Sequence, residues 1–504
     1  MDLRPVHEPG EVGPIPRRAL AARQRRALPW RVFLTCWLVY VFFWTPFIIR
    51  EHFPALALAE SGSLNVERYV GWTEDIFRGP RGGAFINNNP GASLTGAIPL
   101  LLLRPLLARV DEWNQRLPRP GWRNTDSVMF QRTLDEGRGL YFLLVAFLTA
   151  ALVMAPLTAA TAAYFCARLL QIGLPAASAA GCALVYGLGT PVLFRIGHLN
   201  HNLLVGDAGF TALLLLWDPD GRPLARWRAL TAGLLAGYAI LCDYSGLVVI
   251  VVTALYVWFR SAGCPAGQRV RTMSAFAAGL FPAFAALAIY QAWAFGSPLR
   301  PPQLYMAPTA PTSRGYRGFD WPSLSLVWAN FFDPRFGLFA WCPALLLAFW
   351  APFARRLRYR VPRLETRIIF TWFGLFVIFC AANQYSWLQP STGFRYLVPV
   401  VPLLALLSIQ AVQNWPPLVR RSLAVACCVQ SMIVAAAQKN DVRLSLATLW
   451  ERKFEMLWLV RLGQAGAPVA WWWSPAAYAL VGLGVALLWF TTRARSQWHK
   501  VATL

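Results

Sequence analysis

The sequence is poor in charged residues, and above all in acidic ones. Only 14% of its 504 residues are charged, with 23 Asp and Glu against 47 Lys and Arg, whereas 57% are hydrophobic. A water-soluble fold of this length could not bury so much apolar surface. Apolar runs long enough to cross a hydrocarbon core of about 30 Å recur along the chain. The composition therefore predicts an all-α, polytopic integral membrane protein.

Residues that form disulfides or bind metals are also scarce. The nine cysteines lie mostly in apolar runs and include no CxxC pair, which argues against a disulfide framework and against a zinc-thiolate site. His198 and His201 in GHLNHN would furnish two metal ligands. Two His without a clear carboxylate or a third His favour interfacial hydrogen bonding instead. A divalent metal is the one cofactor left open.

The net charge of +24 does not indicate nucleic-acid binding, because the basic residues are scattered between the apolar runs and do not form one solvated face. They gather before the first run and in every second loop after it. These groups lie at 17–26, 222–228, 260–271, 355–367, 420–421 and 493–500. Such alternation is the positive-inside pattern, which predicts that these loops and both termini are cytoplasmic.

The first apolar run, at 31–50, follows a basic N-terminus at 1–30 and has no small-residue cleavage site behind it, so we expect a retained membrane span. Residues 51–138 carry ten acids and ten arginines, and the lack of basic excess places this long loop outside. Its short apolar stretch at 92–107 predicts an interfacial helix lying in the headgroups.

The rest of the bundle, at 139–491, brings the total to about twelve spans. A cytoplasmic C-terminus follows at 492–504. Besides the first loop, the larger external loops are expected near 295–336, 383–395 and 439–474.

Three acids in LNVERYVGWTEDIFRG are candidate catalytic residues: Glu67, Glu74 and Asp75. Helical spacing would put Glu67 and Glu74 on one face. A carboxylate at this place would serve as a general base for an acceptor hydroxyl or as a metal ligand. The alternative for each one is a solvated loop acid paired with Arg68 or Arg78.

Other polar residues cluster at the predicted external boundary. Asn88 belongs to GPRGGAFINNNPGAS, whose Gly, Asn and Pro content predicts an ordered, ligand-contacting loop. Asp243 lies where two spans meet, and is either a second site acid or a cap of the following helix.

Arg395 and Tyr396 stand at the external mouth of a span, where a guanidinium suits a lipid phosphate or snorkels toward headgroups. Arg314 and Arg317 in TSRGYRGFD are looser candidates for the same role.

Four patterns, in this order, carry a family resemblance over nearly the whole chain: VERYVGWTED, AFGSPLRPP, DPRFGLFAWCPALLL and GFRYLVPVVPLLALL. They resemble the C superfamily of membrane glycosyltransferases, especially the bacterial relatives of protein O-mannosyltransferases and the aminoarabinose transferases that modify lipid A. Those relatives often carry Asp-Glu in the first-loop motif, where this chain has Val66 and Glu67. This departure leaves the base open between Glu67 and the Glu74/Asp75 pair.

The resemblance implies a hexosyl- or pentosyltransferase of the cytoplasmic membrane that takes its sugar from a polyprenyl-phosphate donor and transfers it to a hydroxyl acceptor on the external face. It implies direct displacement with inversion, a first-loop carboxylate as base and Arg395 as phosphate partner. Consistently, the sequence has no Gly-rich nucleotide loop and no cytoplasmic DxD motif. A transporter or lipid flippase, or a non-catalytic scaffold, would share the span count.

Overall fold

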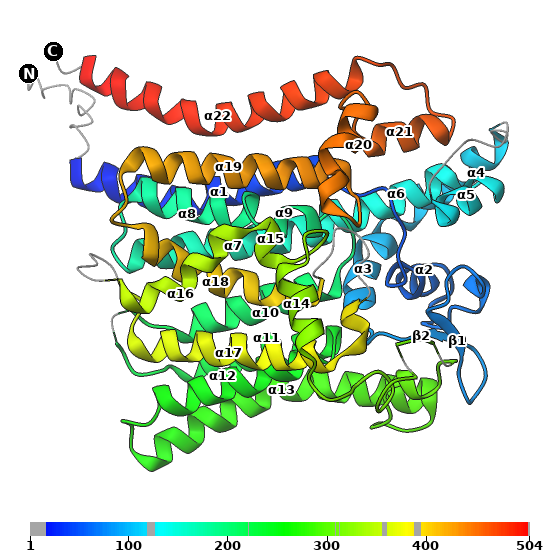
Figure 1. Ribbon diagram of the computed structural model, residues 1–504, viewed down its shortest axis with the longest axis horizontal. Coiled ribbons are helices and arrows are strands. Elements are labelled where there is room, and N and C mark those ends of the chain that lie inside the picture. Colours follow the sequence, from blue (N-terminus) through cyan, green and yellow to red (C-terminus); the bar gives the residue numbers. More distant parts are fainter. Residues whose placement is uncertain are drawn as a thin grey trace, which may run out of the picture.

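The structure is a computed structural model that describes residues 17–117, 127–219, 221–307, 309–311, 313–354, 360–387 and 395–501. Within these ranges the chain is helical apart from loops and one two-stranded hairpin, as predicted for an all-α protein. The helices lie side by side as a bundle (Figure 1). The start of α1 (Arg17–Phe42) and the end of α22 (Trp473–Val501) lie at the same end of this bundle.

Within the part of the chain that the structure describes, six helical segments are long and apolar enough to cross a membrane, so the chain is an integral membrane protein. They are Gly139–Gln171, Ala266–Phe295, Arg363–Ala382, Arg395–Val412, Pro417–Ala437 and Trp473–Phe490. The first joins α6 (Gly139–Thr149), a π-helical turn at Ala150–Met154 and α7 (Ala155–Gln171). The next two are α13 and α17, and the fourth is a 3-10 helix, Arg395–Val400, continued by α18 (Val401–Val412). The last two are α19 and the described part of α22.

Length and apolarity alone find fewer than the predicted twelve or so spans in the described chain. One reason is that several helices are shorter: α8 (Ala176–Leu188), α9 (Val192–Arg195), α10 (His201–Leu216), α11 (Arg226–Cys242) and α12 (Gly246–Arg260). Another is α1, which has 26 residues but carries Arg25, Arg26 and Arg31. A further short helix, α14 (Leu324–Phe332), lies in the predicted loop 295–336. The span predicted at 337–353 is broken into α15 (Leu338–Trp341), α16 (Leu347–Trp350) and two 3-10 turns. Pro343 and Pro352 begin or interrupt those turns, because proline cannot donate to a helical ladder.

The first span also differs from its predicted bounds. The helix α1 ends at Phe42, ahead of Pro46, and residues up to Arg50 are irregular. The residue before a proline disfavours helical backbone, and the chain is therefore free to turn here toward the site.

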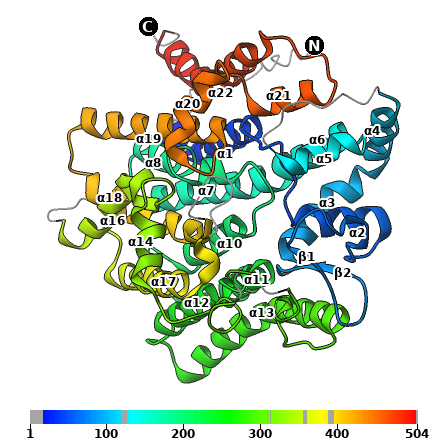
Figure 2. The ribbon, with the colours of Figure 1, turned by 45° about the vertical axis from the view of Figure 1, so that its right-hand side comes forward.

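The long first loop folds into short elements at one end of the bundle (Figures 1 and 2). These are α2 (His52–Ser61), a 3-10 helix at Glu67–Tyr69, strands β1 (Ile76–Arg78) and β2 (Ala84–Ile86), α3 (Gly91–Leu102), α4 (Arg104–Arg116) and α5 (Val128–Asp135). The axes of α3 and α4 form an angle of 78°. The loop holds short helices, as predicted, but the one helix predicted at 92–107 is broken at Leu103 into α3 and α4, which together are long and apolar enough for one bent span. Leu106 and Trp113 on α4 are exposed. Their place in the headgroups stays a prediction.

The remaining predicted loops also hold short helices. They are 3-10 helices at Pro302–Leu304, Gln384–Trp387 and Val442–Leu444, together with α20 (Ser445–Glu451) and α21 (Leu457–Gln464). Residues 388–394 of the predicted loop 383–395 lie outside the described residues.

Two features hold the first loop against the bundle. Arg138, whose side chain is 6% exposed, forms ion pairs with Glu60 of α2 at 3.2 Å and with Asp111 of α4 at 2.9 Å. Its guanidinium also lies 4.1 Å from the Tyr141 ring centroid on α6. Gly91 at the start of α3 is so close to the end of α11 that an added Cβ would meet Leu241 backbone atoms at 2.7 Å. The loop is therefore seated on the ends of α6 and α11.

Candidate functional site

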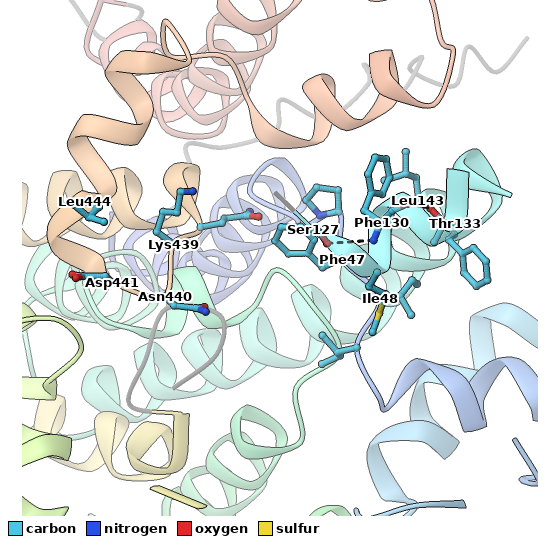
Figure 3. A pocket seen from close by; sticks show the side chains of 15 residues that line it. Phe47, Ile48, Ser127, Phe130, Thr133, Leu143, Lys439, Asn440, Asp441 and Leu444 are labelled. Atoms are coloured by element: carbon cyan, nitrogen blue, oxygen red, sulfur yellow. Dashed lines mark hydrogen bonds between the residues drawn. The ribbon is translucent and has the colours of Figure 1, made fainter. Parts of the chain in front are cut away.

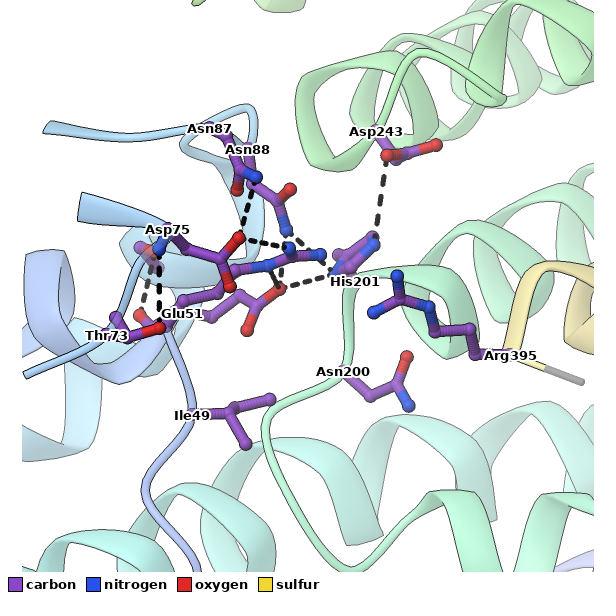
Figure 4. A network of polar contacts seen from close by, with 12 residues as sticks. Ile49, Glu51, Thr73, Asp75, Asn87, Asn88, Asn200, His201, Asp243 and Arg395 are labelled. Atoms are coloured by element: carbon purple, nitrogen blue, oxygen red, sulfur yellow. Dashed lines mark hydrogen bonds and ion pairs between the residues drawn. The ribbon is translucent and has the colours of Figure 1, made fainter. Parts of the chain in front are cut away.

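A buried carboxylate lies at the centre of a polar network between the first loop and the bundle (Figure 4). Glu51 precedes α2 directly, and its side chain is 2% exposed. Its Oε1 accepts from Asn88 Nδ2 at 2.5 Å and lies 2.6 Å from His201 Nδ1 and 3.2 Å from Arg50 Nε. Three donors therefore converge on one oxygen of this acid.

The charge of Glu51 follows from these contacts. Burial by itself raises the pKa of Glu51, but the Arg50 guanidinium and His201 more than offset it and hold the pKa well below its usual range. Glu51 is therefore ionised at physiological pH and fixes the orientation of its donors.

The hairpin adds a second acid to the network. The antiparallel register pairs Ile76 with Ile86, which places Asp75 and Asn87 opposite each other just beyond the ladder. Asp75 Oδ1 accepts from Asn87 Nδ2 at 2.8 Å and from Arg50 Nη1 at 3.3 Å. Arg50 thus lies between two carboxylates, Glu51 and Asp75.

Asp243 ends α11 in an extended conformation. Its Oδ1 accepts from the backbone N–H of Ser245 at 2.9 Å and so closes the turn before α12, but the N-cap of that helix is Ser245, and Asp243 does not cap it. Its role as a site acid stays a prediction. Its Oδ2 lies 3.8 Å from His201 Nε2. Asn89 donates to the Ile240 carbonyl at 2.7 Å and thereby ties the Asn87–Asn89 loop to the same helix end.

A cavity of about 420 Å³ opens beside this network. Polar side chains from the first loop, from α11 and from the loop after α13 line it, and apolar side chains of α13 (Ala266–Phe295) line it as well. The polar lining includes Arg50, Asn87, Asn88, Asp243, Gln303 and Arg317, and the apolar lining on α13 is Phe284, Leu287 and Ala288. Phe284 is 41% exposed, whereas Leu287 is buried. The cavity therefore combines cationic and other polar groups with an apolar wall.

Arg395 lies behind the cavity. Its residue is 7% exposed, its Nη2 donates to the Tyr396 hydroxyl at 3.1 Å, and Tyr396 itself lines the cavity. The guanidinium points toward His201 in Figure 4. The first-loop acid Asp75 and Arg395 thus lie at the same end of the bundle, Asp75 in the network and Arg395 behind Tyr396.

Not all of the predicted residues reach this site. Glu67 and Glu74 are exposed, and Glu67 pairs with Arg78 at 2.7 Å while its side chain is 45% exposed. The prediction of one helical face for these two acids is wrong, because the segment holds a three-residue 3-10 helix followed by a turn and a strand. Glu67 is therefore a solvated loop acid paired with Arg78, which is the alternative considered for it.

The two predicted arginines of the TSRGYRGFD segment differ in position. Arg314 is exposed, whereas Arg317 lines the cavity with a backbone φ of +52°. A positive φ is costly for a residue with a Cβ, so the tight turn that aims Arg317 stores strain at the cavity.

The two predicted histidines also lie in different surroundings. His201 joins the network, whereas His198 is buried beside it with its Nε2 3.5 Å from Asn200 Nδ2. Burial lowers the pKa of His198 well below its usual value. Among the described residues, no group of three or more His, Cys, Asp or Glu side chains is arranged to hold a metal ion.

A second cavity of about 520 Å³ lies on the other side of the same chain segment (Figure 3). Ile49 lines this cavity, and the next residue, Arg50, lines the first one. Phe47, Ile48, Phe130 and Leu143 form its apolar side, and Lys439, Asn440 and Asp441 face them from the segment after α19 (Pro417–Ala437).

Sequence reasoning missed Arg50, Glu51 and Asn87. A signal for the first two was present, because Arg50, Glu51 and His52 are three consecutive ionisable residues directly after an apolar run. Ionisable residues at a membrane boundary require partners, and such a triplet predicts a buried network. Beyond the chemistry of this network and its cavities there is no relative to guide the assignment, since comparisons with models of known protein families, with curated proteins and with solved structures find no match.

Proposed function

We propose that the protein is a glycosyltransferase of the cytoplasmic membrane that moves a hexose or pentose from a polyprenyl-phosphate donor to a hydroxyl acceptor on the external face. The observation that carries the proposal is the cavity beside Arg50. Arg50 and Arg317 suit a phosphate, Asp243 suits a reacting hydroxyl, and the apolar α13 wall suits a lipid chain. These are the three parts of a lipid-linked sugar transfer, and they match the resemblance of the sequence to the C superfamily.

The topology we propose has about twelve spans, with the short helices counted as passages through the membrane. Two observations support it. The start of α1 and the end of α22 share one end of the bundle, and the first loop lies at the other (Figure 1). The predicted cytoplasmic loops at 222–228 and 260–271 also lie next to each other, since Arg260 Nη2 donates to the Arg222 carbonyl at 2.9 Å. By the positive-inside rule the site then faces outward.

Asp243 is the best-placed base among the acids of the network. Glu51 is ionised but buried under three donors, and Asp75 shares one oxygen with Arg50 and Asn87. Asp243 lines the cavity directly, and a guanidinium does not engage it within the described residues. Its carboxylate is therefore available to a hydroxyl.

In the proposed reaction the acceptor oxygen attacks the anomeric carbon of the sugar while Asp243 takes the hydroxyl proton. The bond between that carbon and the phosphate oxygen breaks, and its electron pair leaves with the lipid phosphate. Arg50 and Arg317 stabilise the charge that develops on this phosphate, and Arg395 adds positive potential from behind Tyr396. Glu51 and Asp75 orient Arg50.

The full-length protein in lipid nanodiscs, supplied with a panel of polyprenyl-phosphate hexoses and pentoses and a membrane-extract acceptor, tests the proposal. We expect release of polyprenyl phosphate from at least one donor. D243N should lower that rate about 10²- to 10⁴-fold, as for the loss of a general base. D135N, a change of an exposed acid on α5, is the matched control.

Two outcomes overturn the proposal. One is a folded wild-type protein that cleaves no donor, and the other is D243N with an unchanged rate. Movement of a labelled lipid across a liposome bilayer without cleavage would identify a flippase instead.

A further inference from the structure

His201 stands between two carboxylates that come from different parts of the fold. It is the first residue of α10, and its side chain is 6% exposed. Nδ1 lies 2.6 Å from Glu51 Oε1, and Nε2 on the opposite edge of the ring lies 3.8 Å from Asp243 Oδ2. The ring therefore connects the buried acid to the acid in the cavity wall (Figure 4).

The position of the ring hydrogen follows from these two distances. A neutral imidazole has one N–H, and here both ring nitrogens face a carboxylate. Glu51 is ionised, and a contact of 2.6 Å to its oxygen requires a hydrogen on Nδ1. In the neutral form of the ring, which the relay uses, Nε2 then faces Asp243 Oδ2 with its lone pair across 3.8 Å, a distance longer than a direct hydrogen bond.

Several charged and titratable groups surround this pair. Arg50 and Glu51 come from the segment before α2, Asp243 from the end of α11, and Arg395 and Tyr396 from the 3-10 helix before α18. Arg195 and His198 precede α10.

The neighbouring histidines stay neutral. Burial lowers the pKa of His52 to about 4, and it holds the pKa of His198 well below its usual value. Neither of them contacts Asp243. Among these three imidazoles, His201 is thus the one placed to exchange a proton with the cavity.

We infer that Glu51, His201 and Asp243 form a proton relay, in which His201 draws from Asp243 the proton that the acceptor hydroxyl loses. The inference rests on the proposed function. As the acceptor oxygen bonds to the sugar, its proton passes to Asp243 Oδ2 and then to His201 Nε2. The resulting imidazolium lies between two carboxylates, and Nε2 returns the proton to water when the product leaves. His201 is a positioning residue, because it acts through Asp243.

The pH profile of the transferase reaction tests the relay in the full-length protein. H201Q should lower kcat about tenfold to hundredfold, change the KM for the lipid donor by less than about threefold, and shift the acidic limb of the profile. E51Q should shift the same limb, and H198Q should keep the wild-type shape. An H201Q profile that coincides with wild type would overturn the relay.

A second measurement does not depend on activity or on the folding of a variant. Solid-state ¹⁵N NMR of ring-labelled histidine in bilayers should show the hydrogen of His201 on Nδ1 in the wild-type protein. Hydrogen on Nε2 would overturn the relay, whatever the activity. The expected tautomer in a protein that cleaves no donor would end the proposed function, and with it the relay of an acceptor proton, while the hydrogen bond from His201 to Glu51 would stand. An active enzyme with an unchanged H201Q profile would support the proposed function and overturn the relay.

Discussion

Both ends of the helical bundle hold exposed arginines, Arg68 and Arg78 of the first loop among them, but the two ends differ in the partners of their buried arginines. At the end that carries the first loop, Arg50, Arg138 and Arg395 are buried or nearly so, and the first two are bracketed by acids. At the other end several arginines are exposed, among them Arg222, Arg226, Arg271, Arg363, Arg367 and Arg421. Arg228 and Arg168 are buried at that end: Arg228 pairs with one acid, Asp218, at 2.7 Å, and Arg168 donates to the neutral side chains of Tyr164 and Gln171.

Exposed and buried arginines have different roles in a membrane protein. Exposed arginines next to spans fix orientation through their number, and single members are replaceable. A buried arginine is retained only where partners compensate its desolvation, so its removal leaves charges behind. Arg50 and Arg138, each paired with two acids, therefore form mutually compensating charge clusters at the end where the cavity opens.

The largest expected effect on stability is that of replacing Arg138, a buried arginine paired with two acids. R138M leaves Glu60 and Asp111 without their cation, and should lower the free energy of unfolding by about 3–5 kcal/mol. R271M, at an exposed position of α13, should change it by less than about 0.5 kcal/mol. Unfolding in a denaturant series, with both variants in the same detergent, measures the difference. Equal losses would show that the two ends do not differ in this way.

Lowering the pH should destabilise the protein through His52, which is buried at the end of the bundle that holds the site. Its ring bonds to Thr149 at 3.1 Å, and burial lowers its pKa from 6.5 to about 4. The unfolded chain then binds more protons than the folded one below pH 6.5, so stability falls as the pH drops. The loss from this residue should approach about 3 kcal/mol near pH 4, at about 1.4 kcal/mol per pH unit.

Thermal unfolding of the wild type and of H52Q between pH 7 and pH 4 checks this. H52Q is less stable at pH 7, but its midpoint should fall less on acidification. Parallel curves would contradict the assignment of the acid sensitivity to His52.

A moderate effect is expected at Arg50, the cation shared by the network and the cavity. R50K keeps the charge but loses the planar fork that reaches Glu51 and Asp75 together. If Arg50 also holds the donor phosphate, the KM for a polyprenyl-phosphate sugar should rise about tenfold. R78K, which alters a 68% exposed side chain of the same loop, is the control. A KM within about twofold of wild type for R50K would remove Arg50 from the phosphate site.

Much of this arrangement could be predicted from the sequence, and the reason is topological. Alternation of basic and non-basic loops assigned Asp75, Asn88, His201, Asp243 and Tyr396 to one side of the membrane. The structure brings these five residues to one network and cavity, although as many as 321 residue numbers separate them.

What the sequence could not supply is the local backbone of the first loop. Helical periodicity predicts one face for Glu67 and Glu74, but a 3-10 turn and a hairpin form there, and the hairpin register places Asp75 in the network. Glu51 directly follows the predicted first span, where composition alone does not distinguish a buried acid from a solvated one. Its partner His201 is 150 residues away, and no local pattern reports such a contact.

The smallest effects are expected at the two acids that the site leaves outside. The Glu67–Arg78 pair is largely exposed, and exposed pairs contribute about 0–1 kcal/mol. E67Q and E74Q should therefore change donor cleavage less than about twofold, whereas D75N frees Arg50 from one of its two anchors and should slow it several times more. The three variants measured side by side in nanodiscs rank the acids of the loop. A loss at E67Q that exceeds the loss at D75N would mean that the loop rearranges around the bound donor and brings Glu67 to the cavity.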